Sequence, residues 1–330
     1  MERTKRAVSF LMVFVMALSA LTCVMVSSAD EAQAKVTKRT YLIKVNRKKN
    51  VVTVYKRENT DGSFNYNPIR AIRVSCGRAT SRSSTTPKGI FKVGGKEKWC
   101  LLYGNVWGRY SIRFYRHYLF HTVPYKYRNK SASLLVKEYK KLGKKASAGC
   151  VRMSFIDEKW LSKTCPKGTK VVVYSSKQSG PLGKPKAVTF NKKVNVKKKW
   201  LYYDPTDPIK GNKGYNLKAP KIRIDADDEV KQGEVFDPKS GVTAKDERSF
   251  QDLTERIKYK IYKKEETTND EGEPAESWER VSIVSTQNAG EEYKIKYSCY
   301  YKYCSKYTGK KTRYITIEGE EPDENEEQQD

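Results

Sequence analysis

Apolar and polar residues alternate along most of this chain, and a period of two predicts strands rather than helices. Between residues 39 and 176 the alternation begins with two runs around a polar turn, at 41–46 and 51–56, which indicates a hairpin. Further strands are expected at 69–77, 90–95, 110–115, 118–125 and 167–176. A tight turn at Arg116 and His117 would join the third of these strands to the fourth. Residues 39–176 therefore predict one mainly β domain.

A helical period appears only in residues 131–142, where apolar side chains recur near every fourth position. Ser131 is the candidate N-cap of this helix, and Gly143 is its candidate stop signal. A second short helix is expected at 156–164. The mainly β domain is thus predicted to contain one or two short helices.

After residue 176 the pattern changes. Residues 177–218 are rich in Pro, Gly and Lys and weakly periodic, which indicates a linker or an ordered strap. The alternation returns at 219–318, with turn signals between the runs, and predicts a β-sandwich of roughly 100 residues. These runs resemble bacterial immunoglobulin-like modules, which implies either adhesion to the wall or a partner, or a spacer. Residues 319–330 are acidic, without basic or aromatic residues, and predict a disordered tail.

The N-terminus has the pattern of an export segment. Residues 1–6 are basic, residues 7–29 contain no charged side chain, and residues 30–38 read as a polar spacer. The apolar run is long enough to span a bilayer, so it predicts either a cleaved signal peptide or a membrane anchor. Both alternatives place the rest of the chain outside the cytoplasm, in the extracellular cell envelope, and exclude nucleic acid as a partner. The net charge of +28 then favours anionic cell-wall polymers.

The chain has seven cysteines, and outside the cell a cysteine is by default half of a disulfide. Six of them follow the export segment, so complete pairing is arithmetically possible, but the sequence does not define the connectivity. Cys299 and Cys304 are expected either to pair with each other or to stay free. Two histidines and the absence of a CxxC spacing argue against a zinc site.

Cys150 and His121 are the candidate nucleophile and base, because such a pair suffices for acyl transfer through a covalent intermediate. Gly149 permits a sharp turn before the thiol and brings backbone amides close to a substrate carbonyl. Arg152 adds a nearby cation, which favours the thiolate. His117 shares a strand face with His121 by period-two alternation and is predicted to be a turn residue.

Three short motifs occur in order: TPKG at 86–89, HT at 121–122 and SAGCVR at 147–152. With these motifs, residues 39–176 resemble the L,D-transpeptidase catalytic domain, also called the YkuD domain. The resemblance implies a catalytic domain of β-sandwich or mixed-sheet type that needs no cofactor and no metal.

Two departures from the family pattern are visible. Ala148 stands where the family motif has a histidine, which removes one local hydrogen-bond donor. The spacing from His121 to Cys150 is also longer than usual. The extra length falls in the predicted helix at 131–142, which would be either a lid or wall of the cleft, or plain packing.

The resemblance also implies a role for each motif residue. Thr122 would orient His121 through its backbone carbonyl, as the third group of a triad. Backbone amides of Gly149 and of the nucleophile would hold the oxyanion, with Ser147 beside them. Arg152 would either bind a substrate carboxylate or hold the motif loop through an ion pair.

The implied activity is transpeptidation of peptidoglycan stem peptides. The thiol of Cys150 would displace D-alanine from a donor stem, and an amine of an acceptor stem would then form a 3-3 cross-link. Attack by water instead of the amine would make the enzyme an L,D-carboxypeptidase. A non-catalytic wall-binding protein is the alternative from another class, which Ala148 mildly favours and the intact Cys150 and His121 argue against.

Overall fold

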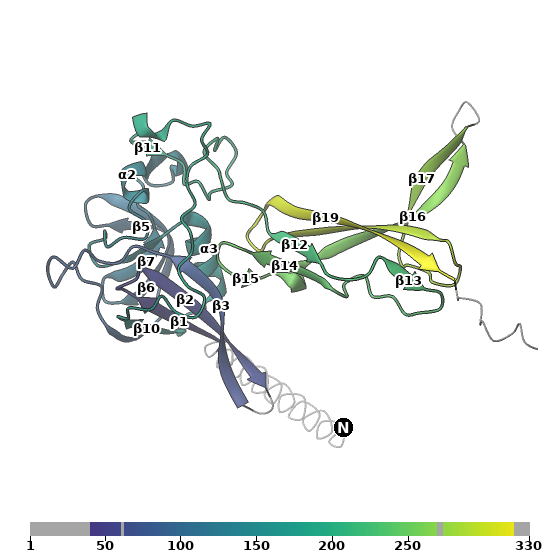
Figure 1. Cartoon of the computed structure of the whole chain (residues 1–330). Helices are drawn as coiled ribbons and strands as arrows, with labels where there is room; N and C mark the ends of the chain where they lie inside the picture. The colour runs from purple at the N-terminus through teal and green to yellow at the C-terminus, as the bar shows by residue number, and fades with distance from the viewer. Residues whose placement is uncertain (1–39, 61–62, 269–272, 320–330) are drawn as a thin grey trace, which may run out of the picture. The chain divides into compact units, whose positions relative to one another are not determined.

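The computed structural model describes residues 40–60, 63–268 and 273–319 (Figure 1). The predicted export segment, the spacer and nearly all of the acidic tail lie outside these residues. Among the described residues, no helix combines the length and apolar character needed to cross a membrane. The chain divides into two compact units, one containing residues up to 130 and 137–184, the other 131–136 and the residues from 185 onward.

The first sheet of the first unit has the strand order β3-β2-β1-β10-β4. Its strands are β1 (Tyr41–Asn46), β2 (Val51–Thr60), β3 (Ser63–Arg73), β4 (Gly89–Lys92) and β10 (Lys170–Tyr174). The first two strands form the predicted antiparallel hairpin, and β10 adds parallel to β1. Ile43 and Val171 pair across β1 and β10 and are both fully buried, which explains the apolar character of both runs.

The second sheet of this unit carries the candidate site. Its order is β5-β6-β7-β9, built from β5 (Lys96–Leu102), β6 (Val106–Tyr115), β7 (Tyr118–Thr122) and β9 (Val151–Met153). The predicted turn between β6 and β7 is present, with Arg116 at a φ of 42°. Strand β9 lies parallel to β7 and pairs Arg152 with His121. This pairing joins the segment after Cys150 to the strand that carries the histidine.

Helix α3 (Phe155–Thr164) confirms the second predicted helix. It contacts β6 and β7. A buried ion pair of 2.8 Å joins Asp157 on this helix to Arg70 on β3. The guanidinium of Arg70 also lies 4.8 Å from the ring centroid of Trp160. These contacts tie the helix to both sheets.

The predicted helix at 131–142 is wrong over most of its length. The chain forms a 3-10 turn η1 (Ser131–Ser133), a short strand β8 (Leu134–Leu135) and a single helical turn α2 (Val136–Tyr139). Strand β8 pairs with β11 (Leu201–Tyr202), which follows the turn η2 (Val196–Lys198). The helical spacing of apolar residues was therefore overridden by a backbone partner more than sixty residues later.

The second unit is also built from strands. A five-stranded sheet has the order β13-β19-β18-β16-β17, and a three-stranded sheet the order β12-β14-β15. The larger sheet comprises β13 (Glu229–Lys231), β16 (Lys258–Thr268), β17 (Pro274–Val281), β18 (Glu292–Tyr301) and β19 (Cys304–Glu318). The smaller comprises β12 (Lys221–Ile224), β14 (Val242–Asp246) and β15 (Gln251–Asp252), which precedes the turn η3 (Thr254–Arg256). The mainly β class is confirmed, while the immunoglobulin-like assignment of this unit stays a prediction.

Candidate active site

A pocket of about 440 Å³ lies between the β5–β6 hairpin, strand β7 and the loop before β9. The candidate nucleophile Cys150, the candidate base His121 and Arg152 all line it. Its remaining walls are largely apolar. They include Leu101, Leu102, Val106, Leu119 and Pro124. The parallel pairing of β9 with β7 is what brings the three motif residues to one cavity.

Cys150 is a free, half-buried thiol. Its sulfur lies 3.9 Å from the carbonyl oxygen of His117, and the backbone N–H of Leu119 donates to it. Burial raises the pKa of the thiol, and Leu119, Arg152 and Arg113 only partly oppose this effect. Arg152 lowers the pKa of the thiol, as predicted, but desolvation outweighs this effect, so the net pKa is raised.

His121 is almost completely buried, and its Nδ1 lies 2.6 Å from the carbonyl oxygen of Thr122. This hydrogen bond assigns the ring proton to Nδ1 and leaves Nε2 as an acceptor. Burial lowers the pKa of His121 to about 3, the charge of Arg152 adds to this effect, and the Thr122 carbonyl opposes it. The imidazole is thus neutral at physiological pH, as a general base must be.

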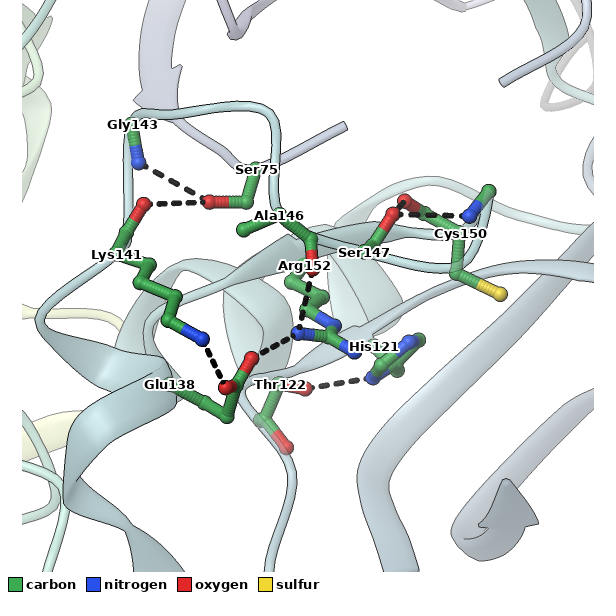
Figure 2. Close-up of polar contacts among 11 residues, drawn as sticks. Ser75, His121, Thr122, Glu138, Lys141, Gly143, Ala146, Ser147, Cys150 and Arg152 are labelled. Carbon is green, nitrogen blue, oxygen red and sulfur yellow. Dashed lines mark hydrogen bonds and ion pairs between the residues drawn. The ribbon is translucent and has the colours of Figure 1, made fainter. Parts of the chain in front are cut away.

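The sulfur of Cys150 and the imidazole of His121 face the same cavity without a direct hydrogen bond between them (Figure 2). In Figure 2 the ring nitrogen that does not contact Thr122 lies on the side of the ring toward Cys150. Hydrogen bonds between catalytic groups are often long before substrate binds. The arrangement therefore suits a thiol and a neutral base that engage when a substrate fills the pocket.

The loop before Cys150 is held in place by Ser147. Its hydroxyl donates to the carbonyl of Cys150 at 2.5 Å and accepts from the N–H of Gly149 at 3.1 Å. Ser147 is fully buried and braces the loop, and its expected role beside the oxyanion donors stays a prediction. The N–H of Gly149 is likewise occupied. Of the two predicted oxyanion donors, only the N–H of Cys150 has no hydrogen-bond partner among the described residues.

Gly149 is required for a steric reason as well. Its φ is +114°, and a Cβ at this position would lie 2.5 Å from the ring of Tyr118. Only glycine adopts this conformation without strain and leaves room for the ring. The sharp turn predicted from the sequence is present, and it directs Cys150 into the pocket.

The TPKG motif directly contacts the loop before Cys150. The buried hydroxyl of Thr86 donates to the carbonyl of Gly149 at 2.7 Å and accepts from the N–H of Gly77 at 2.9 Å. Two of the three sequence motifs thus meet at one hydrogen bond. The sequence identified the motif but gave no role for this threonine.

Arg152 forms an ion pair of 2.7 Å with Glu138, which itself binds Lys141 at 2.6 Å. Arg152 was expected either to bind a substrate carboxylate or to form an ion pair that holds the loop. The structure shows an ion pair. Glu138 was missed by the sequence analysis. One sequence feature could have indicated Glu138: it is the only acidic residue between Glu97 and Asp157 in a strongly basic segment.

The pocket also contains residues that the motifs did not indicate. Cys100, Arg113 and the exposed Tyr103 line it, and so does His117. His117 is the turn residue that was predicted, and it also shares the cavity with His121. All six cysteines in the described part of the chain are free, and among them Cys299 and Cys304 are buried and unpaired. No cluster of metal-binding side chains occurs within the described ranges.

Comparison with protein families agrees with the motifs. Residues 40–173 match the sequence model of the L,D-transpeptidase catalytic domain, YkuD. This segment is a YkuD-family catalytic domain. Among curated proteins, the chain is 35% identical over 111 residues to the "Putative L,D-transpeptidase YciB" of Bacillus subtilis (strain 168). That alignment covers 32% of this chain and 56% of the relative, so the chain spans just over half the length of the relative it matches.

Solved structures with a similar domain are more distant. An L,D-transpeptidase from Mycobacterium smegmatis is 16% identical, with a TM-score of 0.32, and the match covers 41% of this chain and 59% of that one. An L,D-transpeptidase (Yku) from Stackebrandtia nassauensis is 21% identical, with a TM-score of 0.30, covering 43% and 59% of the two chains. Similarity at this level does not define what the YkuD domain of this chain acts on.

Proposed function

We propose that this protein is a peptidoglycan L,D-transpeptidase that forms 3-3 cross-links through a thioester on Cys150. The observation that carries the proposal is the shared pocket of Cys150 and His121, in which the thiol is unpaired and the imidazole is neutral. A neutral base beside a free thiol is the minimum needed for nucleophilic acyl transfer.

In the first step, the sulfur of Cys150 attacks the carbonyl carbon between the third and fourth residues of a donor stem. Nε2 of His121 takes the thiol proton as the carbon–sulfur bond forms. The carbon–nitrogen bond then breaks, His121 returns the proton to the departing amine of D-alanine, and a thioester remains. Because the pKa of the thiol is raised and that of the imidazole is low, proton transfer accompanies attack rather than precedes it.

In the second step, a side-chain amine of an acceptor stem attacks the thioester. His121 takes a proton from the amine, the carbon–sulfur bond breaks, and the proton returns to the sulfur of Cys150. One peptide bond is lost and one amide bond is formed, so the exchange needs no external energy source. The N–H of Cys150 is the proposed oxyanion donor in both steps, a role that typically contributes about 10²–10³ in rate per donor.

The pocket walls favour the transpeptidase over the L,D-carboxypeptidase. Leu101, Leu102, Val106 and Pro124 line the same pocket as Cys150. Apolar walls exclude water once the donor is bound, which protects the thioester until an amine arrives. Hydrolysis at the same site is the second outcome that product analysis distinguishes.

We infer that the protein works at the cell envelope. The basic and then uncharged N-terminal pattern supports export, either as a secreted protein or with an N-terminal anchor. The stem peptides of peptidoglycan are the proposed partners, and they lie outside the cytoplasm.

The test uses the full-length protein in mild detergent. Incubation with a carbapenem is expected to add one adduct to Cys150, detected by peptide mass spectrometry, and a tetrapeptide muropeptide is expected to yield 3-3 dimers. The variant Cys150→Ala should lose both, whereas Cys100→Ala, which removes the other thiol of the pocket, should keep both. Release of D-alanine without dimers would assign a carboxypeptidase, and the absence of any adduct would favour a non-catalytic binding protein.

A further inference from the structure

The positive charge of this protein is concentrated in its catalytic unit. Residues 40–184 contain 32 Lys and Arg against six Asp and Glu, whereas residues 185–330 contain 28 against 29. A long-range field from this distribution attracts anions to the unit that carries Cys150. A general field does not define a binding site, which also requires a concave surface lined by several cations.

A second pocket, of about 160 Å³, meets this requirement. It shares no residue with the pocket of Cys150. Its cationic lining consists of Arg47, Lys48 and Lys145, and it contains no acidic residue. None of the three cations forms an ion pair with another residue of the described part of the chain. Their charges therefore remain available to a bound anion.

Arg47 is held in place by two hydrogen bonds. Its Nε donates to the hydroxyl of Ser175 at 3.0 Å, and its Nη1 donates to the carbonyl of Thr86 at 2.6 Å. These contacts account for two of the five N–H groups of a guanidinium and fix its plane. A fixed guanidinium loses little freedom when it binds an oxyanion, which makes it a suitable anchor.

Two of the three lining cations, Arg47 and Lys145, act electrostatically on the buried thiol of Cys76 in the pocket wall. Burial raises the pKa of this thiol to about 12, while a hydrogen bond with Thr86 and the charges of Arg47, Lys145 and Lys184 act in the opposite direction. Lys184 also donates to the carbonyl of Gly143 at 2.8 Å. No carboxylate contributes to the field at this thiol.

We propose that this pocket binds a phosphate group carried by a phosphodiester-linked anionic polymer of the envelope. A guanidinium fork with two ammonium groups matches the oxygens of a phosphate in charge and geometry. The small volume fits one such group and excludes a stem peptide. The proposal goes beyond the transpeptidase activity, because binding here involves neither Cys150 nor His121.

The phosphate pocket lies next to the loop that carries Cys150. Thr86 accepts from Arg47 through its carbonyl, and its hydroxyl donates to the carbonyl of Gly149 in the nucleophile loop. The pocket therefore lies directly behind the loop that carries Cys150. A polymer bound there holds the catalytic unit against the wall while leaving the cavity of Cys150 open for stem peptides.

The test compares two variants of the full-length protein that have the same net charge. Lys48→Glu/Lys145→Glu alters the phosphate pocket, and Lys167→Glu/Lys170→Glu alters two exposed lysines that do not line it. Binding of poly(glycerol phosphate) is measured by calorimetry at 0.15 M salt, with inorganic phosphate as competitor and polyglutamate of equal charge as a carboxylate control. We expect the pocket variant to bind the phosphate polymer at least tenfold more weakly, the control variant to stay within threefold of the native protein, and inorganic phosphate to compete.

Equal weakening in both variants would show that only net charge matters, and would overturn the phosphate pocket. Equal affinity for polyglutamate would overturn its phosphate chemistry. Carbapenem labelling of Cys150 is measured on the same samples and is expected to be unchanged in both variants. A failure of polymer binding is thereby separated from a failure of the transpeptidase assignment.

Discussion

The hydroxyl of Thr86 donates a hydrogen bond of 2.7 Å to the carbonyl of Gly149, a residue 63 positions later in the chain. The same hydroxyl accepts from the N–H of Gly77, so one buried threonine joins three backbone segments at the nucleophile loop. The TPKG motif at 86–89 thus has a defined structural role here. It fixes the backbone that directs Cys150 into its pocket.

Replacing this hydroxyl should loosen the loop. The variant Thr86→Val keeps the volume but leaves the N–H of Gly77 and the carbonyl of Gly149 without partners, at a cost of about 1–3 kcal/mol for buried groups. We expect a lower free energy of unfolding and slower carbapenem labelling of Cys150. Thr85→Val is the matched control, since the hydroxyl of Thr85 bonds only within its own loop, to the carbonyl of Ser81. Equal losses in both variants would contradict the role of Thr86.

The ion pair between Arg152 and Glu138 leads to a second prediction. Glu138→Ala leaves the partly buried guanidinium of Arg152 without its counter-ion, and a lost hydrogen bond to a charged group costs about 1.5–3 kcal/mol. Chemical denaturation should show this loss together with slower labelling of Cys150. Lys141→Met removes the other partner of Glu138, but Lys141 is 53% exposed, so its effect should stay below about 1 kcal/mol. Similar effects of both changes would refute a specific role for Arg152.

The raised pKa of the Cys150 thiol predicts how the rate of its alkylation depends on pH. Because burial raises the pKa of Cys150, the reactive thiolate becomes abundant only above its ordinary value of 9.0. Alkylation of Cys150 by iodoacetamide should therefore keep rising through pH 9, as measured on the Cys150 peptide by mass spectrometry. No step is expected near pH 6.5, because the pKa of His121 is about 3. A plateau below pH 8 would instead indicate a preformed thiolate–imidazolium pair.

The buried carboxyl of Glu158 on α3 makes the free energy of unfolding depend on pH. Glu158 is fully buried, and its oxygens have no hydrogen-bond partner in the described structure. Burial raises the pKa of this carboxyl well above its usual value, the charge of Asp157 adds to the rise, and Lys96 opposes it. The folded state therefore holds this proton to higher pH than the unfolded chain does. The contribution of Glu158 to the free energy of unfolding is therefore fully present below the pKa that this carboxyl has in the unfolded chain. It is lost as the pH rises through the pKa of the carboxyl in the folded protein.

Glu158→Gln removes this titration. Relative to the native protein, the variant should gain stability steadily between pH 4 and pH 8, with a Tm roughly a few degrees higher at pH 8. Glu97→Gln, at an exposed carboxyl, is the control and should show no such trend. Thermal unfolding followed by circular dichroism across this range checks both. A pH-independent difference between the native protein and Glu158→Gln would rule out the proposed titration.

The sequence determined the features that depend on neighbouring residues. Alternation at 41–46 and 51–56 predicted the first hairpin, and the short helix expected at 156–164 matches α3 to within one residue. The positive φ of Gly149 and its contact with Thr86 could not be seen directly, yet both belong to motifs that the sequence showed. Local propensity and motif chemistry are encoded along the chain, so these predictions needed no partner strand.

Tertiary structure decided the rest. The apolar period at 131–142 became a short strand because β11 supplied a backbone partner from a distant segment. Glu138 forms an ion pair with Arg152 because folding brings their two elements together, with 2.7 Å between the carboxylate and the guanidinium. The thiol of Cys150 gained a raised pKa, although an arginine stands two residues away, because burial depends on everything that surrounds the sulfur. Strand pairing and desolvation are properties of the folded chain, and no run of neighbouring residues contains them.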